Sequence, residues 1–338
     1  MNLITGATGI VGAQVALQLL KQQQPVVAIK RSGSDVSKTK KLFSYYSENY
    51  EELFRLIKWV EADVNDIYSL LDALEGISVV YHCAGFVSFD DKKHTKKLHK
   101  INAEGTANVV NACLEKKGIA LCHISSIATL QNPDITTNIT ESIVWKSSPS
   151  VSQYAISKYN AEREVWRGIE EGLQAVIVNP GIILSAGFWE QSSSKLFSTC
   201  YNENKFYTNG SSASIDVRDV AQCMIQLTNS KQFAKRFILI ENNYCFQHIS
   251  FEIHKLFNKK TPTILAGKPL LWLAQWADYI ACVFSDRERL ITQNIVTALL
   301  EKNTYSNKHI TETLNYKFIP LEESIQFICK AYLNDLKK

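Results

Sequence analysis

Two side chains in this sequence combine the types and the spacing of an acid–base pair. Tyr154 and Lys158 stand four residues apart, so on a helix they share one face, one turn apart. A lysine ammonium beside a phenol favours the phenolate, which would let the tyrosine exchange a proton near neutral pH. Because a free tyrosine has a pKa of about 10, this needs a fall of about three units, or about 4 kcal/mol of charge stabilisation.

The same spacing occurs a second time. Among the 14 tyrosines, Tyr201 also has a lysine four residues on, Lys205. The pair alone does not choose between the two positions, so the surrounding elements must.

A glycine-rich turn follows the first apolar run. Gly6, Gly9 and Gly12 come directly after residues 2–5 and open an amphipathic stretch over residues 9–23. In a strand–turn–helix, glycines allow a tight turn and a close approach of the backbone to a pyrophosphate at the helix N-terminus. The spacing Gly-x-x-Gly-x-x-Gly differs from the common Gly-x-Gly-x-x-Gly form, but its position predicts a dinucleotide site.

Short β-branched runs alternate with longer amphipathic ones over the first two thirds of the chain, which predicts βαβ units and a parallel sheet. We expect strands at 2–5, 26–29, 56–60, 78–82, 119–124, 174–179 and 237–240, and helices at 9–23, 35–57, 98–117 and 152–171. After residue 240 the pattern indicates helices and loops without strand alternation. The expected fold class is α/β, a Rossmann-type doubly wound parallel sheet with a smaller, mainly helical C-terminal substrate-binding portion. We expect the Rossmann domain over residues 1–184 and about 216–242, and the substrate-binding portion over 185–215 and 243–338.

Composition narrows the class of protein. The chain has 338 residues, 46% of them hydrophobic and 21% charged, with a net charge of +4 that is too small to predict nucleic-acid binding. Its eight cysteines are scattered through apolar runs, which predicts reduced thiols and no metal site. The N-terminus enters an apolar strand without a charged leader, so we expect a cytoplasmic protein. The most apolar stretch, 269–284, is too short to span a bilayer and contains Asp278. We expect a buried or pocket-lining helix there in preference to a membrane contact, and no transmembrane segment.

Further motifs fall in order along the chain. They are Asp63-Val64, His82-Cys83-Ala84-Gly85, Asn102-x-x-Gly105-Thr106, Ser125-Ser126, Asn179-Pro180-Gly181 and Asp216-Val217-Arg218-Asp219-Val220. With the glycine turn and Tyr-x-x-x-Lys, this order resembles the extended short-chain dehydrogenase/reductases of the NAD-dependent epimerase/dehydratase superfamily. The residues of these motifs are most similar to those of the dihydroflavonol reductase and 3β-hydroxysteroid dehydrogenase-like branch. The resemblance covers residues 1–240 well and the tail loosely. In this family the tyrosine lies between the fifth and sixth strands, which selects Tyr154 over Tyr201.

The resemblance implies an oxidoreductase acting on CH–OH groups. Hydride would pass between a nicotinamide and a carbonyl carbon while Tyr154 exchanges the oxygen's proton, and Lys158 would lower the tyrosine pKa and hold the nicotinamide ribose. Ser126 is the preferred third catalytic hydroxyl and Ser125 the alternative. The expected cofactor-binding residues are Thr5, Gly6, Thr8, Gly9, Ile10, Val11, Gly12, Arg31, Asp63, Val64, Cys83, Ala84, Gly85, Asn102, Ser125, Tyr154, Lys158, Pro180, Gly181, Ile182 and Ile183. Other polar residues have structural interpretations: His82 and His123 as packed histidines, Asn102 as a brace for the loop around the site, and Asp219 as a helix cap.

The residues at the end of the second strand indicate whether NAD or NADP is the cofactor. An acidic residue there selects NAD, whereas a basic residue accommodates the NADP phosphate. The strand ends with Lys30 and Arg31, and Arg31 offers a planar fork for a phosphate. We therefore expect NADP(H), with NAD(H) as the alternative if Asp35 bends back to the ribose.

The substrate class is suggested by two departures from the pattern of nucleotide-sugar enzymes. Residues 212–215 are Ser-Ala-Ser-Ile, where those enzymes usually carry an Arg-Asp pair. Residues 178–183 have the motif that is typical of the reductase and hydroxysteroid branches. The expected pocket segments are aromatic: Phe86–Phe89, Phe188-Trp189, Phe206-Tyr207, Trp272 and Trp276. They suit a small apolar aldehyde, ketone or sterol-like alcohol. The alternatives are a nucleotide-sugar epimerase or dehydratase with tightly bound NAD, and a non-catalytic NADP-binding regulatory protein; the resemblance allows a monomer or a homodimer.

Overall fold

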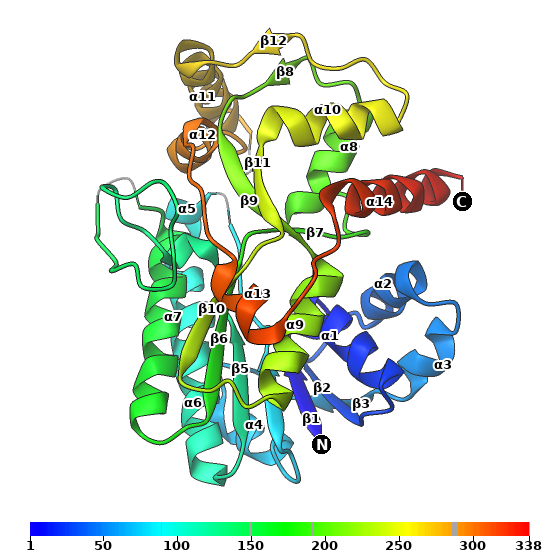
Figure 1. Ribbon diagram of the computed structural model, residues 1–338, viewed down its shortest axis with the longest axis vertical. Coiled ribbons are helices and arrows are strands. Elements are labelled where there is room, and N and C mark those ends of the chain that lie inside the picture. The colour runs from blue at the N-terminus through cyan, green and yellow to red at the C-terminus, as the bar shows by residue number, and fades with distance from the viewer. Residues whose placement is uncertain (89, 149–150, 191, 286–288, 338) are drawn as a thin grey trace.

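A seven-stranded parallel sheet forms the centre of the computed structural model, which describes residues 1–88, 90–148, 151–190, 192–285 and 289–337 (Figure 1). The strand order is β10-β6-β5-β4-β1-β2-β3. The strands are β1 (Asn2–Thr5), β2 (Val26–Lys30), β3 (Lys58–Glu61), β4 (Val79–His82), β5 (Ala120–Ile124), β6 (Ala175–Pro180) and β10 (Lys235–Leu239). All seven expected strands are confirmed, with ends that differ by about two residues at most.

Helices cover both faces of this sheet, as the doubly wound prediction requires. On one face lie α1 (Ile10–Lys21), α2 (Ser37–Tyr46), α3 (Tyr50–Arg55) and α9 (Val217–Asn229). On the other lie α4 (Ile67–Ala73), α6 (Gly105–Lys116) and α7 (Gln153–Glu170). The chain order reverses beside β1, which pairs with β2 on one side and β4 on the other. Ligands of such sheets bind at the carboxyl ends of the strands at this reversal.

The segment expected as one helix over residues 98–117 is divided. Helix α5 (Asp91–Leu98) continues into a π-helical turn, η1 (His99–Glu104), before α6 begins at Gly105. Such turns shift the register of a helix and often occur at functional sites. Here the turn contains Asn102, which is buried.

The smaller part of the molecule lies beyond the carboxyl ends of the central strands (Figure 1). It contains α8 (Lys195–Tyr201), α10 (Phe246–Leu256), α11 (Lys268–Val283), α12 (Gln293–Leu300) and α14 (Leu321–Leu336). Helix α13 (Lys308–Leu314) returns to the central layer, where it packs against β10 and α9 and buries Ile310. The smaller part also has a sheet of β7 (Ile182–Leu184), β9 (Ser211–Asp216) and β11 (Asn242–Cys245), and a pair of β8 (Phe206–Tyr207) and β12 (Ile264–Leu265). The prediction of no strand after residue 240 is wrong, because β11 and β12 pair with strands from earlier in the chain.

Helix α11 confirms that residues 269–284 form a helix, but the expectation of a buried helix is wrong, while a pocket-lining role stays a prediction. Of its residues only Leu271 and Asp278 are buried, and large apolar side chains such as Trp272 and Trp276 are more than half exposed. Its apolar residues run around the helix, and the packing partner, α12, covers one face only. Among the described residues no helix is long and apolar enough to cross a membrane.

The expectation that Asp219 caps α9 is also wrong. Asp216 is the cap and accepts a hydrogen bond of 2.8 Å from the Arg218 N–H. The Asp219 carboxylate instead accepts bonds from the Tyr316 hydroxyl at 2.8 Å and the Ile319 N–H at 2.9 Å. Burial raises the pKa of Asp219 to about 6. This residue therefore ties the segment before α14 to the central layer.

Candidate active site

The glycine turn between β1 and α1 has the geometry of a phosphate-binding turn. Gly6 has a positive φ of +68°, and the Gly9 N–H donates to its carbonyl at 2.9 Å. A Cβ at Gly12 would lie only 2.4 Å from the Gly6 carbonyl oxygen, so a side chain there would displace the turn. No described side chain caps α1, so its first N–H groups remain for an anion. Thr8, Ile10 and Val11 occupy this turn and first helical turn and are partly buried.

Thr5 is used within the protein rather than displayed to a ligand. Its hydroxyl lies 2.7 Å from His82 Nδ1 and accepts a 3.0 Å hydrogen bond from the Ala84 N–H. His82 Nε2 reaches the Thr106 hydroxyl at 2.9 Å. Burial lowers the pKa of His82 to about 3, so the ring is neutral near pH 7. This agrees with His82 as a packed histidine that joins the ends of β1 and β4.

Asn102 braces the loop that follows β4. Its Oδ1 accepts from the Phe86 N–H at 2.7 Å, and its Nδ2 donates to the Phe86 carbonyl at 3.0 Å and to Ser157 Oγ at 2.9 Å. The loop of Cys83, Ala84 and Gly85 is thereby held against α7. The arrangement fits the bracing interpretation of Asn102.

Helix α7 carries Tyr154 and Lys158 to the carboxyl end of β5. Its cap is Ser152, whose Oγ accepts from the Ala155 N–H at 3.0 Å. Lys158 is buried and its Nζ donates to the Ile124 carbonyl at 2.7 Å. A Cβ on Gly85 would lie 3.9 Å from this Nζ, so the ammonium faces the loop after β4. Burial lowers the pKa of Lys158 to about 8, and the nearby Glu162 charge opposes that fall.

The pKa of Tyr154 differs from the expectation. Burial raises it above the ordinary 10, and a hydrogen bond with Ser126 lowers it only in part. The net direction is opposite to the expected fall, and a lowering of this pKa by Lys158 stays a prediction. The physical reason is that the Lys158 ammonium is engaged by the Ile124 carbonyl while the phenol loses hydration.

The two serines at the end of β5 have different environments. Ser125 is buried, and its hydroxyl donates to Glu162 Oε2 at 2.8 Å. Ser126 has its hydroxyl on the Tyr154 side, and this oxygen also accepts from the Ala128 N–H at 3.1 Å. Neighbouring residues of extended backbone point in opposite directions, which explains why one serine meets the protein interior and the other the tyrosine.

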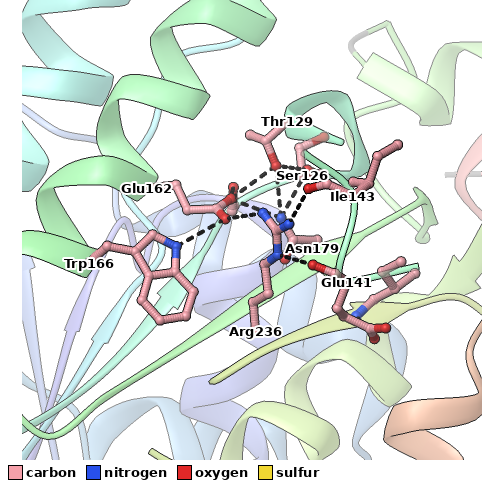
Figure 2. A network of polar contacts seen from close by, with 10 residues as sticks. Ser126, Thr129, Glu141, Ile143, Glu162, Trp166, Asn179 and Arg236 are labelled. Atoms are coloured by element: carbon pink, nitrogen blue, oxygen red, sulfur yellow. Dashed lines mark hydrogen bonds and ion pairs between the residues drawn. The ribbon is translucent and has the colours of Figure 1, made fainter. Parts of the chain in front are cut away.

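Behind Ser126 lies a buried polar cluster, the Glu162 network, of Ser125, Thr129, Glu162, Trp166, Asn179 and Arg236 (Figure 2). The Glu162 carboxylate accepts from Asn179 Nδ2 and from Arg236, each at 3.0 Å. Arg236 also donates to the carbonyls of Glu141 and Ile143, at 2.7 and 2.8 Å. A single buried carboxylate thus connects α7, β5, β6 and β10.

This network also holds the backbone of Ser126. Asn179 Nδ2 donates to the Ser126 carbonyl at 3.2 Å, and Thr129 Oγ1 lies 2.9 Å from both that carbonyl and Glu162 Oε2. Glu162, Thr129 and Arg236 are absent from the residues singled out in the sequence. The available signal was the spacing, since Glu162 follows Lys158 by four residues and so occupies the next turn of the same helix face.

The remaining cofactor candidates lie around the carboxyl edge of the sheet. Arg31 is exposed just after β2, and Asp35 is engaged in a local turn, accepting from the Ser37 N–H at 2.9 Å and the Ser37 hydroxyl at 2.5 Å. Asp63 accepts from the Asn65 N–H at 2.9 Å. Val64 is buried beside Gly105. Pro180, Gly181, Ile182 and Ile183 run from β6 into β7, and a Cβ at Gly181 would lie 2.5 Å from the Ala213 carbonyl oxygen.

The aromatic segments expected to line one pocket are spread over the molecule. Phe86 lies beside Asn102, as its bonds show. Trp189 donates to Asp335 at 3.0 Å and packs against Tyr332 in the core of the smaller part. Phe206, Trp272 and Trp276 are exposed, and Phe89 lies outside the described residues. A substrate pocket lined by these segments stays a prediction.

The chain is similar to known proteins in its sequence. A family model described as the NAD dependent epimerase/dehydratase family matches residues 2–238. A putative dihydroflavonol 4-reductase of Synechocystis is 30% identical over 64% of this chain and 60% of its own length, which is less than two thirds of that relative. Cinnamoyl-CoA reductase 1 of Petunia hybrida is 27% identical over 71% of this chain and 72% of its own.

Solved structures show the same fold. A dTDP-glucose 4,6-dehydratase from Streptomyces venezuelae, solved with NAD bound, has a TM-score of 0.76 and 12% identity over 99% of this chain and 98% of its own. The family match covers the glycine turn, Ser126, Tyr154 and Lys158 together, and it confirms the resemblance seen in the sequence. On this evidence the chain belongs to the NAD dependent epimerase/dehydratase family.

Proposed function

We propose that this protein is an NADPH-dependent reductase that converts an apolar carbonyl compound to its alcohol, with Ser126, Tyr154 and Lys158 as its catalytic residues. One observation carries the proposal. The hydroxyl of Ser126 is on the Tyr154 side and lowers the pKa of that phenol, whereas the Ser125 hydroxyl donates to Glu162. That division of roles favours Ser126 over Ser125 as the hydroxyl for the reacting oxygen.

The residues around the glycine turn fit a dinucleotide. The turn at Gly6 and Gly12 is compact because a side chain on either residue would collide with the backbone, and the uncapped start of α1 offers N–H donors to a pyrophosphate. When bound, the nicotinamide supplies the hydride. Arg31 is exposed just after β2, where a basic residue accommodates the NADP phosphate, while the competing carboxylate, Asp35, is hydrogen-bonded to Ser37. Both facts favour NADPH over NADH.

The pKa directions suit the reduction direction. Because burial raises the pKa of Tyr154, the phenol is protonated near neutral pH and can donate that proton to the carbonyl oxygen. Lys158 is charged below its pKa of about 8, and its ammonium favours the phenolate left after donation. The Ser126 hydroxyl hydrogen-bonds the same oxygen and orients it.

The substrate class follows from the relatives and from the chain's own residues. Two relatives are named as reductases, a putative dihydroflavonol 4-reductase and a cinnamoyl-CoA reductase 1. Ser212 to Ile215 provide no charged side chain for the diphosphate of a sugar nucleotide. These observations support an apolar, carbonyl-bearing substrate.

The test is oxidation of NADPH in the presence of aromatic and aliphatic aldehydes, ketones and steroids, followed by absorbance. We expect turnover of at least one apolar class. Turnover of a sugar nucleotide without added cofactor would instead establish an epimerase or dehydratase with bound NAD. Binding of NADPH without turnover of any compound would identify a non-catalytic protein.

Changing Arg31 to alanine tests the choice of cofactor. Losing a bidentate phosphate contact worth about 1.5–3 kcal/mol should lower kcat/KM for NADPH by roughly 10- to 100-fold and leave that for NADH nearly unchanged. Arg55→Ala, at an exposed arginine paired with Glu51, is the matched control and should change neither. An equal loss with both cofactors would contradict the role of Arg31.

A further inference from the structure

We propose that the exposed apolar face of α11 binds the surface of an anionic lipid bilayer. We call this face the α11 face; it consists of Trp272, Leu273, Trp276, Tyr279, Ile280, Val283 and Phe284. The exposed fractions of these side chains range from 48% at Tyr279 to 86% at Phe284. Their spacing of three and four residues places them on one stripe of the helix.

The size of this face needs an explanation. Monomeric proteins rarely expose contiguous apolar patches beyond a few hundred Å², and seven large side chains exceed that. Apolar side chains are also exposed on the strand pair of β8 and β12, where Ile264 and Leu265 are 43% and 45% exposed and Phe206, opposite Ile264, is 49% exposed. In Figure 1, β8, β12 and α11 lie together at the end of the molecule farthest from the central sheet.

Lysines gather in the sequence before the patch. From residue 255 to 285 the charged side chains are Lys255, Lys259, Lys260, Lys268 and Asp278. Lys255 and Lys259 pair with Glu252 and Glu203, at 4.0 and 3.8 Å, which leaves Lys260 and Lys268 without an ion-pair partner among the described residues. Asp278 is 6% exposed and accepts from the Leu290 and Ile291 N–H groups, each at 3.1 Å. Lys260 and Lys268 therefore add positive charge beside the apolar side chains. An anionic lipid surface complements that pattern, whereas a symmetric second copy would bring the lysines near one another.

The side-chain types also suit the boundary between headgroups and acyl chains. Trp272, Trp276 and Tyr279 form consecutive edge contacts with ring centres 6.0 Å apart. Tryptophan and tyrosine favour this boundary because they combine an apolar ring with a polar group. With 16 residues, α11 is too short to cross a bilayer, so it would lie in the plane of the surface.

The α11 face is connected to the loop near the candidate active site. After α11 the chain reaches Arg289, whose N–H donates to Asp90 Oδ2 at 3.4 Å. Asp90 follows the Phe86 loop that Asn102 braces. Docking through the α11 face would therefore hold this side of the protein against the lipid.

Vesicle sedimentation with the full chain tests the inference and does not depend on turnover. The probes are phosphatidylcholine vesicles with and without phosphatidylglycerol. We expect sedimentation with the anionic vesicles, weaker sedimentation with the neutral ones, and a roughly tenfold loss of anionic binding in Lys260→Gln/Lys268→Gln. The double variant Leu273→Glu/Ile280→Glu should lose roughly a hundredfold in binding.

The matched control places the same changes on exposed leucines elsewhere. Leu56 and Leu336 are 63% and 53% exposed, so Leu56→Glu/Leu336→Glu should bind vesicles like the parent chain. Circular dichroism confirms that each variant is folded. Absence of sedimentation with anionic vesicles, or equal binding by Leu273→Glu/Ile280→Glu, would overturn the proposal. Sedimentation velocity showing a dimer that this variant dissociates, without vesicle binding, would assign the face to a second copy.

Discussion

Replacing Tyr154 by phenylalanine should lower kcat by about a hundredfold to ten-thousandfold, the range for loss of a general acid. The phenyl ring keeps the packing of α7, while the proton donor and its hydrogen bond with Ser126 disappear. The affinity for NADPH and the thermal unfolding temperature should change little. Steady-state kinetics with NADPH titration and calorimetry measure all three quantities.

The control for this change is the other tyrosine with a lysine four residues on. Tyr201 packs its ring against Phe257 and Tyr332 in the smaller part, far in sequence from the serine pair. Tyr201→Phe should retain turnover. Full activity in Tyr154→Phe, or an equal loss in both variants, would remove Tyr154 from the catalytic residues.

Removing the Glu162 carboxylate should have a second large effect, on stability and on the pH profile together. Glu162 and Arg236 have side chains only 2% and 17% exposed and are paired at 3.0 Å. Breaking a buried ion pair from one side costs about 3–5 kcal/mol, because the remaining charge loses its partner. We expect Glu162→Ala to lower the free energy of unfolding by about that amount, measured by urea denaturation.

The charge of Glu162 also acts on Lys158. Its negative charge raises the lysine pKa, which burial has lowered to about 8. Because lysine is charged below its pKa, activity should fall as pH rises through about 8 in the parent chain. In Glu162→Gln, which keeps the size of the side chain, that fall should occur at lower pH. The profile of kcat against pH measures the shift.

Glu164→Gln on the same helix is the matched control, since Glu164 forms a surface ion pair with Arg167 at 2.9 Å. It should alter stability by less than about 1 kcal/mol and leave the pH profile in place. A Glu162→Gln variant that is destabilised but keeps the parent pH profile would show a structural role alone.

The sequence predicted those parts of the fold and site that depend on neighbouring residues. The glycine turn, the strand that precedes it and the helix of Tyr154 and Lys158 are local patterns, and each lies where the sequence indicated. The Glu162 network was not predicted because Arg236 stands 74 residues from Glu162 and reaches it only through the pairing of β6 with β10. The exposure of α11 was not predicted either. The hydrophobicity of a helix shows that burying it would be favourable, but it does not show whether another part of the chain packs against it.

The tie between Asp219 and the segment before α14 has a consequence for biosynthesis. Helix α9 covers the central sheet, yet its buried carboxylate finds its donors only at Tyr316 and Ile319, about a hundred residues later. In a nascent chain this carboxylate therefore stays hydrated at the surface of the layer until translation has passed Ile319. The layer that is made first on the ribosome is completed by residues that are made nearly last.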